Sequence, residues 1–366
     1  MDVRISLREL RVAWAVAALA SIALVAATAY TNDFWARFGG GWHAAPFPQK
    51  LLTFMDLGAE NNIGAWFSSM LLATIMWVAV LCFLVDAARG KKDWLRYGWL
   101  LIAAGFAALS FDELGSAHER LDLPDGYLGA MLWYLPIMAL LPVYMLAFGF
   151  SRMRSDPLAI GLIGLGCLCF ATIPAQEYFE TAIRAGSPRP ILELALEEGT
   201  ELAGMLAFLA AFFRYCAVTM REPSMKIAIE PRWFWGIWSA TFLMGLVSRE
   251  IASVLLTPDE LSGNCRNWFP SFAAYLAALL AWYTAGAAQS PFRKGAALGV
   301  AALFLGASLI AGSQIGAFER ILAFRFGTPD MARTVLVVVA FASGLWLSAR
   351  PGAAGTGTAE RDLRAT

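Results

Sequence analysis

The sequence predicts an all-α fold, a polytopic bundle of about ten transmembrane helices, and three observations support this fold class. Hydrophobic residues make up 59% of the chain and charged residues only 15%, and the mean hydropathy is +0.59. Soluble domains contain roughly 45–50% apolar residues. The apolar residues also fall into segments of about 20, the length that crosses the hydrocarbon core of a bilayer. Finally, the basic residues gather at the ends of these segments.

The candidate spans lie near 12–31, 62–86, 95–119, 127–149, 157–182, 193–218, 233–256, 268–287, 295–317 and 329–348. Basic residues precede the first span, separate the second from the third and the fourth from the fifth, and follow the sixth, eighth and tenth. The positive-inside rule places all of them in the cytoplasm. We therefore expect a multi-pass protein of the cell inner membrane with both termini cytoplasmic. One transmembrane domain covers 1–349, with an external loop at 32–60 and a disordered cytoplasmic tail at 350–366.

The first span is compatible with a second interpretation. Arginines precede it, and it ends in "AATAY", whose Ala27 and Ala29 fit the small-residue pattern of a signal-peptidase site. Its apolar run is somewhat long for the core of a signal peptide. The topology of the other nine spans is the same whether or not this segment is cleaved.

Acidic residues collect at the span ends that this topology places outside. The third span ends in "SFDELGSAHER" and the fifth in "IPAQEYFETAI", while the sixth begins with "ELALEEGTELAG". An acid at the centre of a bilayer costs about 2.5 kcal/mol or more, so such residues usually pair or serve a function. We expect one site, with acid/base groups at Glu113, Glu119 and Glu201 and metal ligands at Asp112, His118, Glu177 and Glu198.

A purely structural explanation stays open for several of these acids. The helix macrodipole favours acids at a helix N-terminus by about 0.3–1 kcal/mol, which can account for Glu193 and Glu197 without any function. The acids at the ends of the third and fifth spans can reach water, become protonated, or pair with Arg120 or Arg184. The functional interpretation is favoured because several helices bring acids to the same depth.

The residue types also limit the chemistry. Many carboxylates with one imidazole favour iron, manganese or calcium over zinc as a divalent metal. His43 and His118 are the only histidines, so a di-iron centre with two Glu-x-x-His motifs does not fit. No Gly-x-Ser-x-Gly elbow, phosphate-binding loop or dinucleotide fingerprint occurs. The net charge is zero and no long basic stretch is present, which argues against nucleic-acid binding.

The motifs carry a resemblance to uncharacterised proteins. The series "AENNIGAWFSSMLLA", "SFDELGSAHERL" and "LEEGTELAG" resembles a group of bacterial multipass membrane proteins of unknown function, over roughly the first 220 residues. The chain is more distantly similar to the alkaline ceramidase-like membrane hydrolases, which hold zinc with three histidines. It departs from them because it lacks a His-x3-His near its end, so this resemblance does not extend to zinc amidase activity.

Three functions fit these observations. The first is a metal-dependent enzyme whose externally open site acts on a lipid or lipid-linked substrate. The partners of such a protein are membrane lipids and this substrate. The second is a cation or proton-coupled transporter that uses the same acids, and the third is a scaffold subunit of a membrane complex. The inner halves of the spans read as almost purely apolar, which favours the first. No pattern indicates oligomerisation.

The outward ends of the seventh and ninth spans, "VSREIASVLLTPDE" and "GAFERILAFRFGTPD", faintly echo the Glu-Arg and Pro-Asp elements of the third. Neighbouring opposite charges are most simply self-compensating. These echoes alone therefore do not establish an internal repeat.

Overall fold

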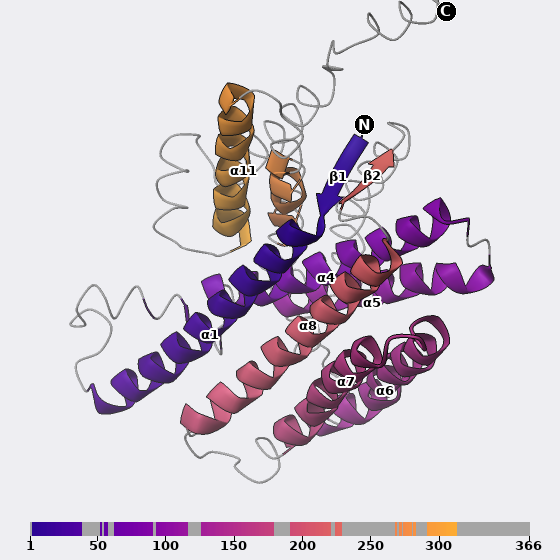
Figure 1. Cartoon of the computed structure of the whole chain (residues 1–366). Helices are drawn as coiled ribbons and strands as arrows, with labels where there is room; N and C mark the ends of the chain where they lie inside the picture. The colour runs from indigo at the N-terminus through magenta and orange to yellow at the C-terminus, as the bar shows by residue number, and fades with distance from the viewer. Residues whose placement is uncertain are drawn as a thin grey trace, which may run out of the picture.

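The computed structural model describes most of the first 228 residues and parts of the remainder. The described residues are 2–38, 52, 55–57, 62–90, 93–115, 126–178, 191–220, 224–228, 268, 271–272, 274–279, 281–282 and 291–312. Their helices (Figure 1) are α1 (Leu7–Arg37), α4 (Ile63–Ala88), the 3-10 helix η1 (Trp94–Tyr97), α5 (Gly98–Gly115), α6 (Gly126–Arg152), α7 (Pro157–Tyr178), α8 (Ile191–Thr219) and α11 (Pro291–Gly312). The residues described between 268 and 282 are also helical.

Five helical segments are long and apolar enough to cross a membrane, and they coincide with the predicted first, second, third, fifth and sixth spans. They are Leu10–Thr31, Ile63–Ala88, Trp94–Leu114, Pro157–Gln176 and Glu193–Thr219. Shorter apolar stretches, Ala139–Arg152 and Ala297–Gly306, overlap the predicted fourth and ninth spans respectively. The predicted seventh and tenth spans and the tail at 350–366 lie outside the described residues. A helical multi-pass membrane protein is therefore confirmed, and the number ten stays a prediction.

The N-terminal segment differs from the prediction in two ways. Helix α1 continues to Arg37, into the expected external loop, where Arg37 forms an ion pair of 2.6 Å with Asp33 one turn earlier. Before α1, strand β1 (Asp2–Ser6) pairs antiparallel with β2 (Ser224–Ala228). The two basic segments that contain Arg4 and Lys226 therefore lie at the same end of the bundle, which agrees with their predicted placement on one side of the membrane.

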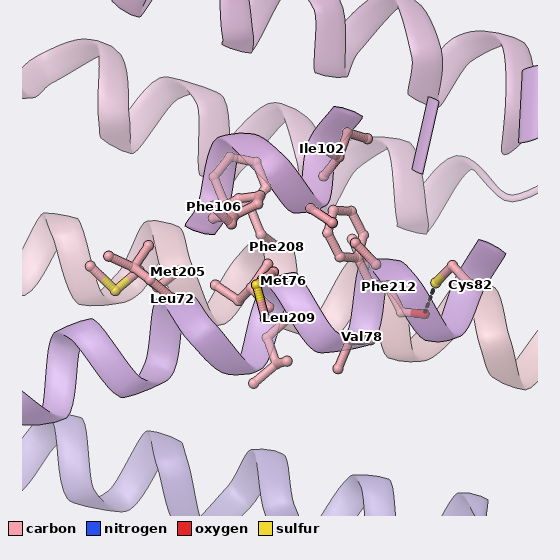
Figure 2. Packing of buried hydrophobic residues seen from close by; sticks show 14 of the residues in the cluster. Leu72, Met76, Val78, Cys82, Ile102, Phe106, Met205, Phe208, Leu209 and Phe212 are labelled. Atoms are coloured by element: carbon pink, nitrogen blue, oxygen red, sulfur yellow. Dashed lines mark hydrogen bonds between the residues drawn. The ribbon is translucent and has the colours of Figure 1, made fainter. Parts of the chain in front are cut away.

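Helix α4 lies at the centre of the bundle. It is apolar on all its faces, the pattern of a helix surrounded by other helices, and 67% of its most apolar stretch is buried, compared with 22% in α1 and α7. It packs against α5 and α8, and α8 also contacts α1 and α7. Figure 2 shows Leu72 and Met76 of α4 beside Phe106 of α5 and Phe208 and Phe212 of α8. We call Phe106, Phe208 and Phe212 the aromatic layer.

Glycines fix how closely α7 and α8 approach. Lipid tails are as apolar as the helices, so helices associate in a membrane through close packing rather than through burial of apolar surface from water. A Cβ on Gly166 of α7 would lie 2.6 Å from the Phe208 ring, and one on Gly204 of α8 would lie 2.7 Å from the Phe170 ring. These two rings lie 5.6 Å apart and occupy the space that the missing side chains leave. This close packing fixes α8 against α7 near the turns of α8 that carry its acids.

Candidate functional site

Aromatic contacts set the register between α5 and α8, which run in opposite directions. The Phe106 ring of α5 lies 5.4 Å from the Phe208 ring of α8. Seven residues earlier in α5, Trp99 lies 4.9 Å from Tyr215, which is seven residues later in α8. Seven residues are within about 20° of two full helical turns. The two contacts therefore mark one stripe on each helix, and these stripes face one another.

Continuing both stripes by seven residues in the other direction reaches Glu113 on α5 and Glu201 on α8. At 1.5 Å per residue, both lie about 10 Å beyond the aromatic layer, at the same level. Both side chains are half-buried. The structure therefore places two predicted acid/base groups on facing stripes at one end of the bundle, which we call the acidic end.

Helix α4 contributes a hydroxyl to the acidic end. The Asn62 side chain caps α4 by accepting a hydrogen bond of 3.0 Å from the Ala65 backbone N–H. This start places Ser68 in the second turn, where its buried hydroxyl donates to Glu113 Oε1 at 2.5 Å. A hydrogen bond to an ionised carboxylate is stronger than one between neutral groups. Ser68 therefore holds the Glu113 carboxylate on the α4 side of its stripe.

The remaining acids of α8 precede Glu201 in the first two turns of the helix. Glu197 is buried, and Glu193 and Glu198 are half-buried. The Thr200 hydroxyl donates to the Glu197 carbonyl at 2.8 Å and accepts from Gln176 of α7 at 3.4 Å. The polar groups of α7 and α8 thus meet at the level of the acidic end.

The predicted metal ligands are only partly described. Asp112 and Glu198 are half-buried, on α5 and α8 respectively. Asp112 precedes Glu113 and therefore points about 100° away from it. The backbone of Glu177 lies in the last turn of α7, but its side chain, and all of His118 and Glu119, fall outside the described residues. Within the described residues, no three His, Cys, Asp or Glu side chains gather closely enough to hold a metal ion.

The opposite end of the bundle contains a polar cluster that the sequence interpretation missed. Asp86, in the last turn of α4, is fully buried. Its carboxylate accepts hydrogen bonds from Tyr215 Oη at 2.5 Å, from Trp99 Nε1 at 3.1 Å and from Arg152 Nε at 2.8 Å. Arg152 Nη2 also pairs with Asp86, and Arg152 Nη1 pairs with Asp93 at 2.8 Å. We call these five residues the Asp86 network.

This network corrects the expectation that the inner halves of the spans are almost purely apolar. Asp86 is the last residue of the predicted second span, and Arg152 follows the fourth. The basic residues at span ends were interpreted only as signals of orientation. Asp86 and Arg152 have opposite charges and stand at span ends on the same predicted side of the membrane. This combination is the feature of the sequence that could have indicated an ion pair between the two helices.

The fold and both polar clusters define a multi-pass helical membrane protein with ionisable groups at each end of its bundle. Residues 8–216, more than half of the chain, match the family described as Domain of unknown function (DUF8692), and the chain belongs to this family. The matched region covers nearly all of α1 and α8 and the whole of α4–α7, and hence includes the acidic end and the Asp86 network. No curated protein and no solved structure matches the chain.

Proposed function

We propose that the protein is a membrane-embedded, metal-dependent enzyme that acts at its acidic end on a lipid or lipid-linked substrate. The observation that carries the proposal is the position of Glu113 and Glu201, at one level and on facing stripes of α5 and α8. A pair of carboxylates whose surroundings differ suits general acid and base catalysis, because one of them can hold a proton while the other stays ionised.

The two carboxylates have different surroundings. Glu113 accepts the Ser68 hydroxyl at 2.5 Å, which holds this carboxylate beside α4. Glu201 lies one turn before Gly204, where α7 and α8 pack closely. We assign Glu113 as the base and Glu201 as the acid. Glu119, outside the described residues, remains a third candidate.

The metal would be held beside this pair. Asp112 and Glu198 are the described members of the proposed ligand set, which His118 and Glu177 complete. Oxygen ligands with one imidazole suit manganese, iron or calcium. The cation supplies a water of lowered pKa when it is bound, so the reaction needs no serine or cysteine nucleophile. The position of the acids at the end of the bundle, rather than at its centre, suits a substrate whose polar group stays at the membrane surface.

The test is metal content in the purified protein. We expect the wild type to retain a stoichiometric divalent metal by elemental analysis, and after treatment with a chelator to bind one Mn²⁺. Asp112→Asn and Glu198→Gln should lose the metal. Glu193→Gln is the matched control on α8, because Glu193 lies in the first helical turn, where the macrodipole accounts for it.

The metal part of the proposal fails if the wild type retains no metal and binds no Mn²⁺. It also fails if the control variant loses as much metal as the two ligand variants. Correct folding of each variant is checked by its thermal unfolding in detergent.

A second function is favoured by one observation, the presence of ionisable groups at both ends of the bundle. The acidic end and the Asp86 network lie on either side of the aromatic layer, as a proton or cation pathway with a central barrier would require. Proton or Mn²⁺ uptake into vesicles containing the protein tests this alternative. Uptake that is abolished by Glu201→Gln would support transport over catalysis.

A further inference from the structure

Two stretches of the chain share a short pattern that the spans alone did not reveal. The start of α4 reads Asn-x3-Trp-Phe-x-Ser at residues 62–69, and the same pattern occurs at residues 264–271. The helix that follows reads Ala-Ala-x-Phe-x3-Ser at residues 103–110 in α5 and again at residues 301–308 in α11. Both regions therefore carry the two patterns in the same order, and the serine that ends each pattern lies in a helix.

The serines of the two patterns form the same contact twice. The Ser69 hydroxyl donates to the Ser110 carbonyl at 2.7 Å, and the Ser110 hydroxyl donates to the Ser69 carbonyl at 2.9 Å. Ser271 and Ser308 exchange the same two bonds at 2.8 Å each. The Oγ atoms lie 3.1 Å apart in both pairs. Each pair clasps the two helices of its own hairpin.

The tryptophans of the two patterns cross between the hairpins. Trp66 Nε1 donates to Ser308 Oγ at 3.1 Å, and Trp268 Nε1 donates to Ser110 Oγ at 3.1 Å. Exchanging the two hairpins therefore leaves the contacts unchanged. Such an arrangement is isologous, the kind that a two-fold axis produces between two copies of one surface.

Two further observations support equivalence of the hairpins. Thr74 and Tyr275 share a hydrogen bond of 2.6 Å. The separation of these two residues along the chain is nearly the same as that of Trp66 and Trp268. The first helices of the two hairpins therefore run in the same direction. Phe106 and its counterpart Phe304 are both buried in their hairpins. The local axis therefore lies along the helices.

The two hairpins differ at the positions that matter for the acidic end. In α5, Asp112 and Glu113 follow Ser110 by two and three residues. In α11, the residues that follow Ser308 by two and three are Ile310 and Ala311. Trp268 also packs its ring edge-to-face against Phe111, the residue before Asp112, with ring centroids 5.5 Å apart. The hairpin without acids thus contacts the helix that carries them, immediately beside the carboxylates.

We propose that residues 62–115 and 264–312 are two copies of one duplicated helical hairpin, paired about a local two-fold axis, and that the second copy positions α5 for the site of the first through Trp268. Trp268 is a positioning residue, since it acts through Ser110 and Phe111. Its counterpart Trp66 makes the same bond to a hairpin that has no acids. The positioning role rests on the proposed function, whereas the duplication does not.

The matched pair Trp268→Phe and Trp66→Phe tests the positioning role. Each change removes one indole N–H and keeps an aromatic ring, so we expect similar losses of thermal stability. Only Trp268→Phe should weaken binding of Mn²⁺, by about tenfold, the lower range for groups that support metal ligands. Free Mn²⁺ is followed by its electron paramagnetic resonance signal. Equal Mn²⁺ affinity in the two variants would overturn the role of Trp268.

Cysteine cross-linking tests the duplication separately. In the full chain without its native cysteines, the pairs Ser69→Cys with Ser110→Cys and Ser271→Cys with Ser308→Cys should form disulfides under the same oxidant and to a similar extent. Failure of the second pair alone would overturn the duplication. Failure of the wild type to bind Mn²⁺ would instead overturn the proposed function and the role of Trp268, and would leave the duplication to the cross-linking result.

Discussion

The two ends of the bundle contain the same kind of group, a carboxylate among helices, in opposite settings. At one end, Asp86 accepts hydrogen bonds from Trp99, Tyr215 and Arg152, which belong to three different helices. At the other, Glu113 and Glu201 lie on facing stripes, and Glu113 accepts a hydroxyl from Ser68. The Asp86 carboxylate accepts hydrogen bonds from donors on other helices, one of them the cationic Arg152, and so connects these helices. Two carboxylates at one level are instead the arrangement at which we propose that a proton or a cation binds.

The burial of Asp86 has an energetic cost that its partners offset. Moving a charge from water into a protein interior costs several kcal/mol, and only well-placed partners compensate for it. The Asp86 network supplies such partners from α5, α6 and α8, and the loop residue Asp93 shares Arg152. We therefore interpret the network as structural, whereas the acidic end is the site that we propose to be functional, and the following variants test this difference.

The largest effect is expected for Asp86→Asn. The change removes the charge that compensates the largely buried Arg152 guanidinium, and breaking a buried ion pair from one side lowers the free energy of unfolding by about 3–5 kcal/mol. Unfolding in detergent, by heat or by a denaturing surfactant, measures the loss. The control is Asp33→Asn, which removes an exposed pair with Arg37 and should cost less than about 1 kcal/mol. Similar values for the two variants would show that the Asp86 network does not stabilise the bundle.

Glu201→Gln should change stability in the opposite direction. It removes one of the two carboxylates that lie at the same level on facing stripes of α5 and α8, so with the metal chelated the free energy of unfolding should stay the same or rise by about 1 kcal/mol, as is common when a functional group is neutralised. The same variant should lose activity once the substrate is known. A decrease of more than about 2 kcal/mol would place Glu201 in the same class as Asp86, a structural carboxylate.

The sequence predicted the fold more fully than the sites. Hydropathy locates a span such as Ile63–Ala88 because the bilayer imposes its length. The level shared by Glu113 and Glu201 depends on how the rings of Phe106 and Phe208 pack. This packing sets the register between α5 and α8, which the residue pattern of a single helix does not predict. The sequence predicted these acids as candidates, and the structure adds that Glu113 and Glu201 lie at the same level on facing stripes of α5 and α8.

The Asp86 network and the duplicated hairpins were missed for different reasons. Asp86 and Arg152 each stand at a span end, where a charge is common and reaches water, so nothing in either segment indicates burial. The hairpins share only short patterns, and the spacing between corresponding residues changes from one helix to the next. The reciprocal bonds of Trp66 and Trp268 show that these few residues correspond.

The smallest effect on stability, and the sharpest comparison within one turn of a helix, comes from Ser68 and Ser69. Both side chains are buried in α4. Ser68 donates to Glu113, whereas Ser69 exchanges bonds with Ser110. Side-chain hydrogen bonds between membrane helices contribute about 0.6 kcal/mol on average, so Ser68→Ala should lower the free energy of unfolding by about that amount. Ser69→Ala should cost more, because it also leaves the Ser110 hydroxyl without one of its partners.

The functional readout should be reversed. Ser68→Ala releases the Glu113 carboxylate from α4 and should reduce activity, or Mn²⁺ affinity, more than Ser69→Ala does. Unfolding in detergent and Mn²⁺ titration of the two variants provide both measurements. If Ser69→Ala has the greater effect on stability and on Mn²⁺ binding alike, the Ser68 hydroxyl is only packing at the end of α4. The position of Glu113 would then depend on the packing of α5 and not on its hydrogen bond with Ser68. The contrast between the two ends of the bundle would rest on Glu201 alone.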